Sequence, residues 1–402
     1  MENKNKLKNK STYQRGRKVF VGMSGGVDSS VTAVLLKNQG YDVTGVFIKV
    51  WQPDFIECQW KEDRLDAMRV CAFLEIPFLD LDLEKEYKQG VFDYMIDEYK
   101  KGRTPNPDVM CNKKIKFGAF LDFALQNGVD YIATGHYVRL NDLVIKLPSA
   151  EKSLGNQVTK WELLAGVDKN KDQSYFLWTL TQKQLKHCLF PIGEFEKPEV
   201  RKIAKKFNLI NAQKKDSQGL CFVGKVDMKE FLERFIPHKI GDVLNSVGEK
   251  IGEHDGIHYY TLGQRHGFRI LEKGTDDNPY YVVAKDLEKN TLIVSHDFQI
   301  KNGSAPSATI EGGQGNDKNL LEIEDINWIL EKEPDLNKKY SARIRYRQTL
   351  QNCVLERKDD PKSEIGQEKV FVNFEKEQKT ASSGQSIVIY DKDICLGGGV
   401  IK

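Results

Sequence analysis

Apolar and polar positions along the first part of the chain fall into alternating strand-like and helical segments. Residues 19–23 are mostly apolar, a Ser-Gly-Gly turn follows, and apolar residues then recur at helical spacing until Gly40. A second apolar run at 43–50 and a helical pattern at 64–74 repeat this order. Strands separated by helices predict an α/β domain built on a parallel sheet.

The same alternation continues to about residue 207. Two prolines within 103–108 exclude a helix interior and predict an ordered turn before the next helix. Residues 140–160 are polar and weakly patterned, so a hairpin and a loop both remain open. The pattern predicts further strands at 78–81 and 131–134, and helices at 84–101, 113–126, 181–189 and 198–207.

Beyond about residue 219 the pattern changes to short β-type runs separated by glycine and Asp/Asn turns. We expect an α/β domain at 19–218, a small central domain at 219–302, and a barrel or sandwich at 303–402. Residues 1–18 carry many Lys and Arg side chains and predict a disordered basic arm. The expected strands of the β-rich part are 259–262, 280–284, 291–295, 341–347, 370–374 and 386–390.

The composition favours a cytoplasmic enzyme over a membrane or secreted protein. Of the 402 residues, 40% are hydrophobic and 30% are charged, and no apolar run approaches the ~20 residues of a bilayer span. The seven cysteines are an odd number at irregular spacing, which favours reduced thiols over a disulfide framework. Because the net charge is only +3, any nucleic-acid surface must be local.

A glycine-rich segment lies between the first predicted strand and the first helix, where backbone N–H groups and the helix dipole bind phosphate. Its glycines permit close approach, and its serines supply hydroxyl donors. A Walker loop is excluded, because the pattern G-x-x-x-x-G-K-[ST] is absent. On its paired glycines alone, the segment could equally be a simple turn. It comprises Gly22, Met23, Ser24, Gly25, Gly26, Val27, Asp28 and Ser29.

Two cysteines stand in unusual surroundings. Cys111 follows the Pro-Asn-Pro-Asp turn, just ahead of the helix expected at 113–126, a placement that would favour the thiolate. Cys221 lies between glycines on an apparently irregular linker. Taken singly, each cysteine is more often a buried, inert thiol than a reactive one.

The complete strings resemble one family, the tRNA-specific 2-thiouridylases, which belong to the PP-loop ATP pyrophosphatases. The loop Ser-Gly-Gly-Val-Asp-Ser-Ser resembles the signature of that superfamily, and further strings match the narrower family in the same order. The resemblance covers nearly all of the chain except the basic arm. The matching strings are 22–29, 106–112, 134–137, 171–176, 216–222, 260–265, 345–348, 384–386 and 395–399.

The resemblance implies a PP-loop domain with a parallel sheet, a small central domain and a C-terminal β-barrel that contacts tRNA. It implies that ATP adenylates the C2 oxygen of the wobble uridine, position 34, and that sulfur then displaces AMP. Cys221 would carry a persulfide received from a cysteine desulfurase or a sulfur-relay protein. Cys111 would be the nucleophile that forms a disulfide with Cys221, and Asp108 an acid/base or a base-positioning group.

The remaining site residues also follow from the resemblance. Ile48 and Gly135 would join the glycine-rich loop in binding ATP, and Asp28 could hold Mg²⁺ with pyrophosphate. This chain departs from the family at Val50, where an asparagine is usual, so a polar contact with ATP is in doubt there. The expected contacts with the target base are Asn106, Pro107, Asp108 and His136, and those with the rest of the tRNA are Lys171, Asp172, Gln173, Arg345, Tyr346 and Gln385.

Arg343, Arg345 and Arg347 alternate with apolar residues, so a strand at 341–347 would present three cations on one face. Without the resemblance, a solvated edge strand would explain them equally well.

Three other functions remain open on the sequence. An amidating PP-loop ligase would share the loop, but it needs neither cysteine. A tRNA-binding or sulfur-carrying scaffold could keep the fold without the activity. An iron–sulfur cluster could be held by Cys111, Cys221 and a third ligand. We expect no tightly bound organic cofactor.

Overall fold

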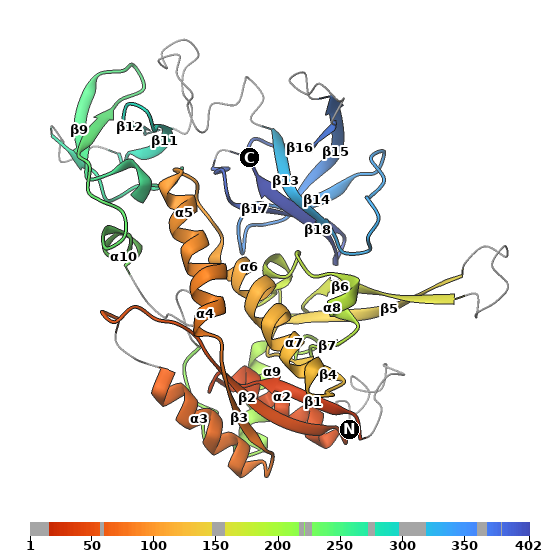
Figure 1. The fold of residues 1–402 in the computed structure, drawn as a ribbon. Helices are drawn as coiled ribbons and strands as arrows, with labels where there is room; N and C mark the ends of the chain where they lie inside the picture. The colour runs from red at the N-terminus through yellow and green to blue at the C-terminus, as the bar shows by residue number, and fades with distance from the viewer. Residues whose placement is uncertain are drawn as a thin grey trace.

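The computed structural model describes residues 16–56, 60–146, 157–216, 221, 227–271, 278–296, 319–359, 368–378 and 380–402. Three sheets lie in separate parts of the molecule, and long helices connect them (Figure 1). A parallel sheet, a small mixed sheet and a closed antiparallel barrel follow in this order, which confirms the predicted fold class. In the described part of the chain, no helix has the length and hydropathy needed to cross a bilayer.

The first sheet has five parallel strands in the order β3-β2-β1-β4-β7. Its central strand β1 buries both faces: Val19 and Val21 pack on one side and Phe20 on the other, as the period of a strand requires. Helices α2, α3 and α9 cover the first side. The elements are β1 Lys18–Gly22, β2 Asp42–Lys49, β3 Phe78–Asp82, β4 Tyr131–Ala133, β7 Cys188–Leu189, α2 Val27–Asn38, α3 Trp60–Phe73 and α9 Lys197–Lys206.

Two long helices contain π-helical middle sections. The second of them covers the Phe20 side of the sheet and begins at Pro107, earlier than the predicted start at residue 113. The Asn106 side chain caps it by accepting from the Val109 N–H at 3.3 Å, and proline is favourable in a first helical turn. Cys111 therefore lies inside this helix and not ahead of it. The first helix comprises α4 Glu84–Tyr87, η1 Lys88–Asp93 and α5 Tyr94–Lys100, and the second α6 Pro107–Cys111, η2 Asn112–Ala119 and α7 Phe120–Gln126.

The central sheet has the order β10-β9-β8-β12-β11, and a short helix that was not predicted, α10, precedes it. The strand expected at 259–262 is wrong, because Ile257–Tyr259 forms the 3-10 helix η4. Ile257, Tyr259, Tyr260 and Leu262 are all buried, so apolar character here reflects packing and not strand pairing. The elements are α10 Met228–Glu233, β8 Gly241–Leu244, β9 Lys250–His254, β10 Arg269–Ile270, β11 Tyr281–Asp286 and β12 Thr291–Ser295.

The C-terminal strands run in the order β13-β16-β15-β14-β17-β18, and pairing of β13 with β18 closes the barrel. The strand expected at 341–347 ends at Arg343, because the chain bends there and Arg347 adopts φ +64°. The three arginines therefore do not share a strand face. The strands are β13 Leu320–Trp328, β14 Tyr340–Arg343, β15 Gln351–Asp359, β16 Glu368–Phe374, β17 Ser386–Asp391 and β18 Ile394–Ile401.

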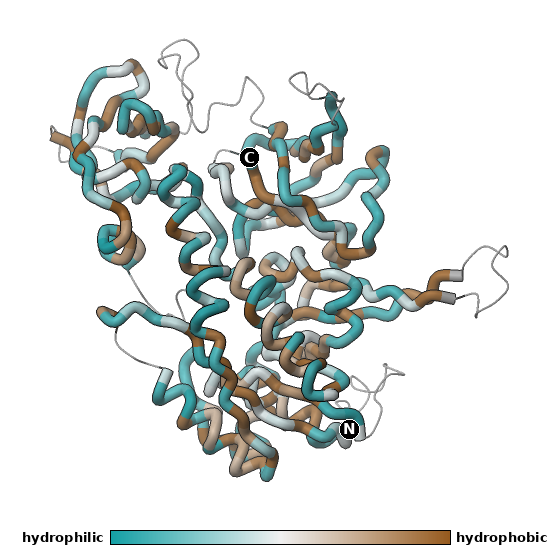
Figure 2. The backbone as a smooth tube through the Cα atoms, viewed as in Figure 1, coloured by the Kyte–Doolittle hydropathy of each residue, from teal (hydrophilic) through white to brown (hydrophobic). Residues whose placement is uncertain are grey.

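The polar segment after β4 is a hairpin, β5 Val138–Lys146 and β6 Gln157–Ala165. Its strand β6 pairs with β18, so this part of the first half of the chain extends the barrel sheet. The hairpin projects from the body and carries exposed Val144 and Val158 (Figure 2). The helix predicted at 181–189 is shorter than expected: α8 spans Gln182–Leu185 and β7 follows, with the 3-10 helix η3 Ser174–Phe176 before them.

Candidate functional site

The glycine-rich loop joins the end of β1 to the start of α2 in a shape that requires glycine. Gly25 has φ +70°, and a Cβ there would lie 2.3 Å from the Asp63 backbone oxygen. Gly26 precedes α2, and no side chain caps the helix at this point. The first N–H groups of α2 thus have no side-chain acceptor, which suits phosphate binding. Ser29 and Ser30 donate to the Gly26 carbonyl oxygen at 3.2 and 2.8 Å and so fix the loop.

Three side chains that the sequence did not single out hold this loop. Lys197 Nζ donates to both carboxylate oxygens of Asp28 at 2.8 and 2.9 Å, and the Tyr137 hydroxyl donates to one of them at 2.8 Å. Asn211 Nδ2 donates to the Gly25 carbonyl oxygen at 2.9 Å. Lys197 begins α9 and Tyr137 follows the predicted His136, but nothing in the sequence pattern links either of them to Asp28.

Gly135 and Ile48, which were predicted to bind ATP, lie after β4 and on β2. A Cβ on Gly135 would lie 2.9 Å from the Ser29 backbone nitrogen, so a glycine allows the segment after β4 to approach the loop. Ile48 lies on β2, the neighbour of β1, and is buried. Val50 is buried as well, so this departure from the family pattern places an apolar side chain in the core.

The two cysteines come together from distant segments. Cys111 Sγ lies 3.4 Å from Cys221 Sγ and donates its S–H to it. Cys111 is fully buried, whereas Cys221 is partly exposed. Burial raises the pKa of the Cys111 thiol well above its usual value, and the negative charge of Cys221 adds to this effect. The expected thiolate at Cys111 is therefore wrong, because the residue lies on the buried face of its helix and not ahead of the helix.

Cys221, in contrast, is stabilised as a thiolate. The hydrogen bond from Cys111 lowers its pKa most, burial opposes this, and the positive charge of Lys116 lowers the pKa further. Asp108 Oδ1 accepts the Cys221 backbone N–H at 3.2 Å, and the Tyr87 hydroxyl donates to the Cys221 carbonyl oxygen at 2.9 Å. Burial raises the pKa of the Asp108 carboxyl, although Lys116 and the Cys221 N–H oppose the change. Lys116 and Tyr87 were not anticipated from the sequence.

His136 is an internal group. Its Nδ1 lies 2.7 Å from Thr134 Oγ1, and its ring packs 5.7 Å from the Phe117 ring. Burial lowers the pKa of His136 well below its usual value, and the nearby Lys116 lowers it further. The imidazole is therefore neutral and only 6% exposed, which allows it to line a site but leaves little surface for a direct RNA contact.

The three side chains at 171–173, which were predicted to contact tRNA, bond to three different parts of the protein. Lys171 Nζ pairs with an Asp216 carboxylate oxygen at 2.5 Å, and Gln173 Oε1 accepts the Tyr137 N–H at 3.0 Å. Asp172 is buried and pairs with Arg343 at 2.5 Å, which joins the first domain to the barrel. This position does not fit the expected direct contact of Asp172 with tRNA.

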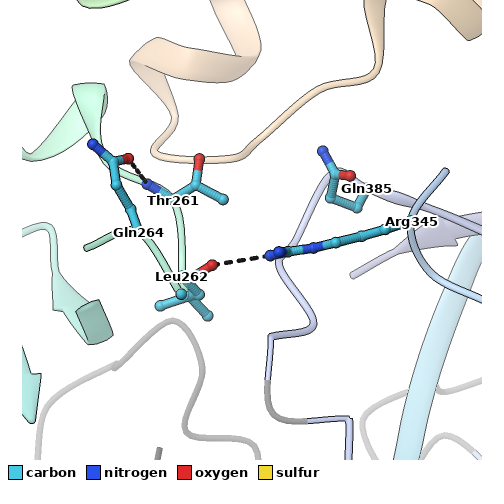
Figure 3. Close-up of a pocket in the computed structure, with 6 residues that line it drawn as sticks. Thr261, Leu262, Gln264, Arg345 and Gln385 are labelled. Atoms are coloured by element: carbon cyan, nitrogen blue, oxygen red, sulfur yellow. Dashed lines mark hydrogen bonds between the residues drawn. The ribbon is translucent and has the colours of Figure 1, made fainter. Parts of the chain in front are cut away.

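Arg345 and Gln385 meet at a pocket of about 250 Å³ between the central domain and the barrel (Figure 3). Arg345 Nη2 donates to the Leu262 carbonyl oxygen at 3.0 Å, and Gln385 Nε2 donates to the Thr104 carbonyl oxygen at 3.0 Å. The pocket thus adjoins the turn that leads to Asn106, Pro107 and Asp108. The Tyr346 ring packs against the Phe176 ring at a tilt of 46°, with ring centroids 4.6 Å apart. The pocket is lined by Thr261, Leu262, Gly263, Gln264, Arg345 and Gln385.

Asp216 links the loop to the segment that carries Cys221. Its carboxylate pairs with Lys197 at 2.8 Å and Arg201 at 2.8 Å, in addition to Lys171. Lys171 and Lys197 outweigh the effect of burial and lower the pKa of Asp216 to about 2. Lys197 therefore bridges Asp28 of the loop and Asp216.

Known protein families match the chain in three consecutive segments. A tRNA methyl transferase HUP domain matches residues 17–225, a tRNA methyl transferase PRC-barrel domain residues 229–296, and an aminomethyltransferase beta-barrel domain residues 318–401. Proteins named tRNA-specific 2-thiouridylase MnmA are similar over almost their full length. That of Francisella philomiragia is 44% identical over 96% of this chain and 99% of its own. That of Listeria monocytogenes is 45% identical over 97% and 96%, and that of Halalkalibacterium halodurans 46% identical over 96% and 94%.

Proposed function

We propose how this chain, which belongs to the tRNA-specific 2-thiouridylase family and is an ATP-binding tRNA-uridine 2-sulfurtransferase, carries out its reaction. The glycine-rich loop activates uridine, and the cysteine pair delivers sulfur. The observation that carries the proposal is the 3.4 Å distance between the Cys111 and Cys221 sulfurs, whose surroundings raise the pKa of the first thiol and lower the pKa of the second.

The loop half performs the adenylation. Backbone N–H groups at the start of α2 hold the β- and γ-phosphates, while Lys197 adds positive charge beside Asp28. The C2 oxygen of the wobble uridine, position 34, attacks the α-phosphorus, and the bond to pyrophosphate breaks. Mg²⁺ commonly binds through one or two carboxylates plus phosphate oxygens, so the single loop carboxylate of Asp28 fits that ion. The ion would neutralise charge on the departing pyrophosphate.

The cysteine half delivers sulfur in balanced steps. The Cys221 thiolate attacks the terminal sulfur of a donor persulfide, and the donor leaves as a thiolate. The terminal sulfur on Cys221 then attacks C2 of the adenylated uridine, and AMP leaves. Cys111 attacks Cys221 Sγ, so a disulfide forms and both electrons of the broken S–S bond stay with the sulfur on C2. Alternatively, Cys111 attacks first and releases sulfide, which then attacks C2.

Asp108 accepts the Cys111 proton, a role supported by burial, which raises the pKa of the Asp108 carboxyl and makes it a better base than an ordinary carboxylate. Asn106, Pro107 and Asp108 surround the target base, with neutral His136 beneath it. Lys171, Gln173, Arg345, Tyr346 and Gln385 contact the rest of the tRNA, while Asp172 orients Arg343 inside the protein.

The sulfur donor is a persulfide-carrying protein, either a cysteine desulfurase or a sulfur-relay protein. It must load Cys221, because Cys111 is closed to any outside molecule. The domain limits 19–218, 219–302 and 303–402 remain our assignment of the three parts.

The test is nucleoside mass spectrometry of tRNA incubated with ATP, a persulfide donor and either wild type or Cys221→Ser. We expect 2-thiouridine at position 34 from the wild type and none from the variant. The buried barrel cysteine variant Cys353→Ala is the matched control and should thiolate normally. Normal thiolation by Cys221→Ser would refute the sulfur route. Iron and acid-labile sulfide in anaerobically purified protein would favour a cluster instead.

A further inference from the structure

Lys116 lies beside the two cysteines and contacts Cys221, although no sequence motif identified it. It lies on η2, in the helix that carries Cys111. In α-helical register a residue five positions further on would point about 140° away. The i→i+5 bonding of the π-helical section brings residues five apart nearer to one face, and the Lys116 side chain hydrogen-bonds to Cys221. The irregular section of this helix therefore places a cation beside the reactive sulfurs.

The environment of Lys116 is formed by several segments. Its ammonium hydrogen-bonds to the Cys221 sulfur and lies within the electrostatic reach of Cys111, Asp108 and His136. These groups come from α6, from the residues after β4 and from the segment around residue 221. Tyr87 at the end of α4 completes the surroundings, where its hydroxyl is bonded to the Cys221 carbonyl oxygen.

The Lys116 side chain stays protonated in these surroundings. Burial alone would lower the pKa of Lys116, but the interaction with the Cys221 sulfur above all outweighs this effect and raises that pKa above its usual value. An ammonium that stays protonated cannot act as a base at neutral pH. It acts by favouring the negative charge on a neighbouring atom.

We infer that Lys116 is a further catalytic residue, whose ammonium holds Cys221 as the thiolate that accepts sulfur and stabilises the persulfide anion formed there. This inference rests on the proposed role of Cys221 as the sulfur carrier. Lys116 makes no covalent bond and transfers no proton. Its contribution is a fixed positive charge at an atom whose charge changes during the reaction.

The asymmetry between the two thiols follows from this arrangement. Cys111 S–H and the Lys116 ammonium both donate to Cys221 Sγ, so the negative charge rests on the sulfur of the residue that is less buried of the two. The buried sulfur keeps its proton until it is needed as the attacking group.

The inference is tested on the resting protein, without ATP, tRNA or donor. Cys221 is alkylated with iodoacetamide across a pH series in wild type, Lys116→Met and Lys116→Arg, and the modified peptide is quantified by mass spectrometry. Loss of the ammonium should move the midpoint of the Cys221 reaction upward by about one pH unit, which lowers the rate at pH 7 about tenfold. Lys116→Arg should stay near the wild type.

Lys113→Met is the matched control, because Lys113 is exposed on the same helix, and its profile should equal that of the wild type. Thermal unfolding monitors the fold of each variant, and Lys116→Gln replaces Lys116→Met if the latter does not fold. An unchanged Cys221 midpoint in the neutral variant overturns the inference. A loss of ATP affinity with an unchanged midpoint also overturns it and assigns Lys116 to the nucleotide.

The failure of the sulfur-carrier role is a separate outcome. Normal thiolation by Cys221→Ser would remove that role while leaving the alkylation profile of Cys221 intact. Conversely, an unchanged profile in Lys116→Met would leave the Cys221→Ser result standing.

Discussion

The glycine-rich loop and the cysteine pair are two halves of one site, and they are built in opposite ways. The loop is a run of consecutive residues between β1 and α2, and its shape follows from glycines and from hydroxyl bonds within the run. The cysteine pair joins a helix to a segment that lies far along the chain, and its chemistry depends on burial and on a third residue. Phosphate binding can therefore be encoded locally, whereas two unequal thiols require the folded protein.

Replacing Cys111 by serine should affect only the second half of the site and have the largest effect on thiolation. Serine cannot form the disulfide, so thiolation should fall by about 10³-fold or more. ATP-dependent release of pyrophosphate should change far less, and the transferred sulfur should stay on Cys221, as the adduct with uridine C2 in the first route or as the persulfide in the alternative route. Nucleoside analysis, pyrophosphate assay and peptide mass spectrometry follow the three quantities. A parallel loss of pyrophosphate release would show that the two halves are not separable in this way.

Replacing Gly25 by alanine should affect only the first half. A Cβ there meets the Asp63 backbone oxygen at 2.3 Å and is held at a positive φ. The combined strain costs about 2–3 kcal/mol, on the order of a 100-fold loss of ATP affinity. Calorimetry with ATP measures the affinity, and alkylation of Cys221 should be unchanged.

Gly128→Ala is the control for this change, because Gly128 also has a positive φ, but no atom of the described residues lies within 4 Å of the position that its Cβ would take. It should cost about 1 kcal/mol of stability and leave ATP affinity unchanged. Equal effects of the two substitutions on ATP affinity would count against the close approach of Gly25 to Asp63.

Asp216 connects the two halves of the site. Its replacement by asparagine should have the smallest effect of the three substitutions, and this effect is on the stability of the fold. Lys171 and Lys197 outweigh burial and lower the pKa of Asp216 to about 2, below its ordinary value of 3.8. A pKa that is lower in the folded protein stabilises the fold at every pH above the pKa of the unfolded chain. Asp216→Asn should therefore lower the free energy of unfolding by about 2 kcal/mol at pH 7. This stabilisation is lost as the pH falls through 3.8 toward 2, and the difference between wild type and variant should vanish there.

Denaturant unfolding at several pH values measures the difference. Asp80→Asn is the control: Asp80 forms a surface pair with Arg64, and its loss should cost less than about 1 kcal/mol. A difference between wild type and Asp216→Asn that stays constant down to pH 2 would contradict a role for the carboxylate charge.

Sequence reasoning succeeded where structure is local. The order of strands and helices up to α7, the loop and the strand end at Gly135 followed from periodicity and turn residues. The reasoning failed where long-range packing decides. Cys111 was expected ahead of a helix, but a cap at Asn106 starts that helix earlier and buries the thiol. No local pattern could show that Arg343 pairs with Asp172 or that Lys116 meets Cys221.

Because of the hairpin β5–β6, the segments that match known domain families do not coincide with the parts of the chain that form one sheet. By sequence similarity, 17–225 and 318–401 match separate domain families. In the structure, β13 and β6 pair with the same edge of β18. Ile323 on β13 pairs with Ile401, and Leu163 on β6 pairs with Cys395. A gene cut between the two segments would leave part of that edge bare. A barrel without the hairpin would therefore lack the strand that pairs with Ile394 and Cys395 of β18.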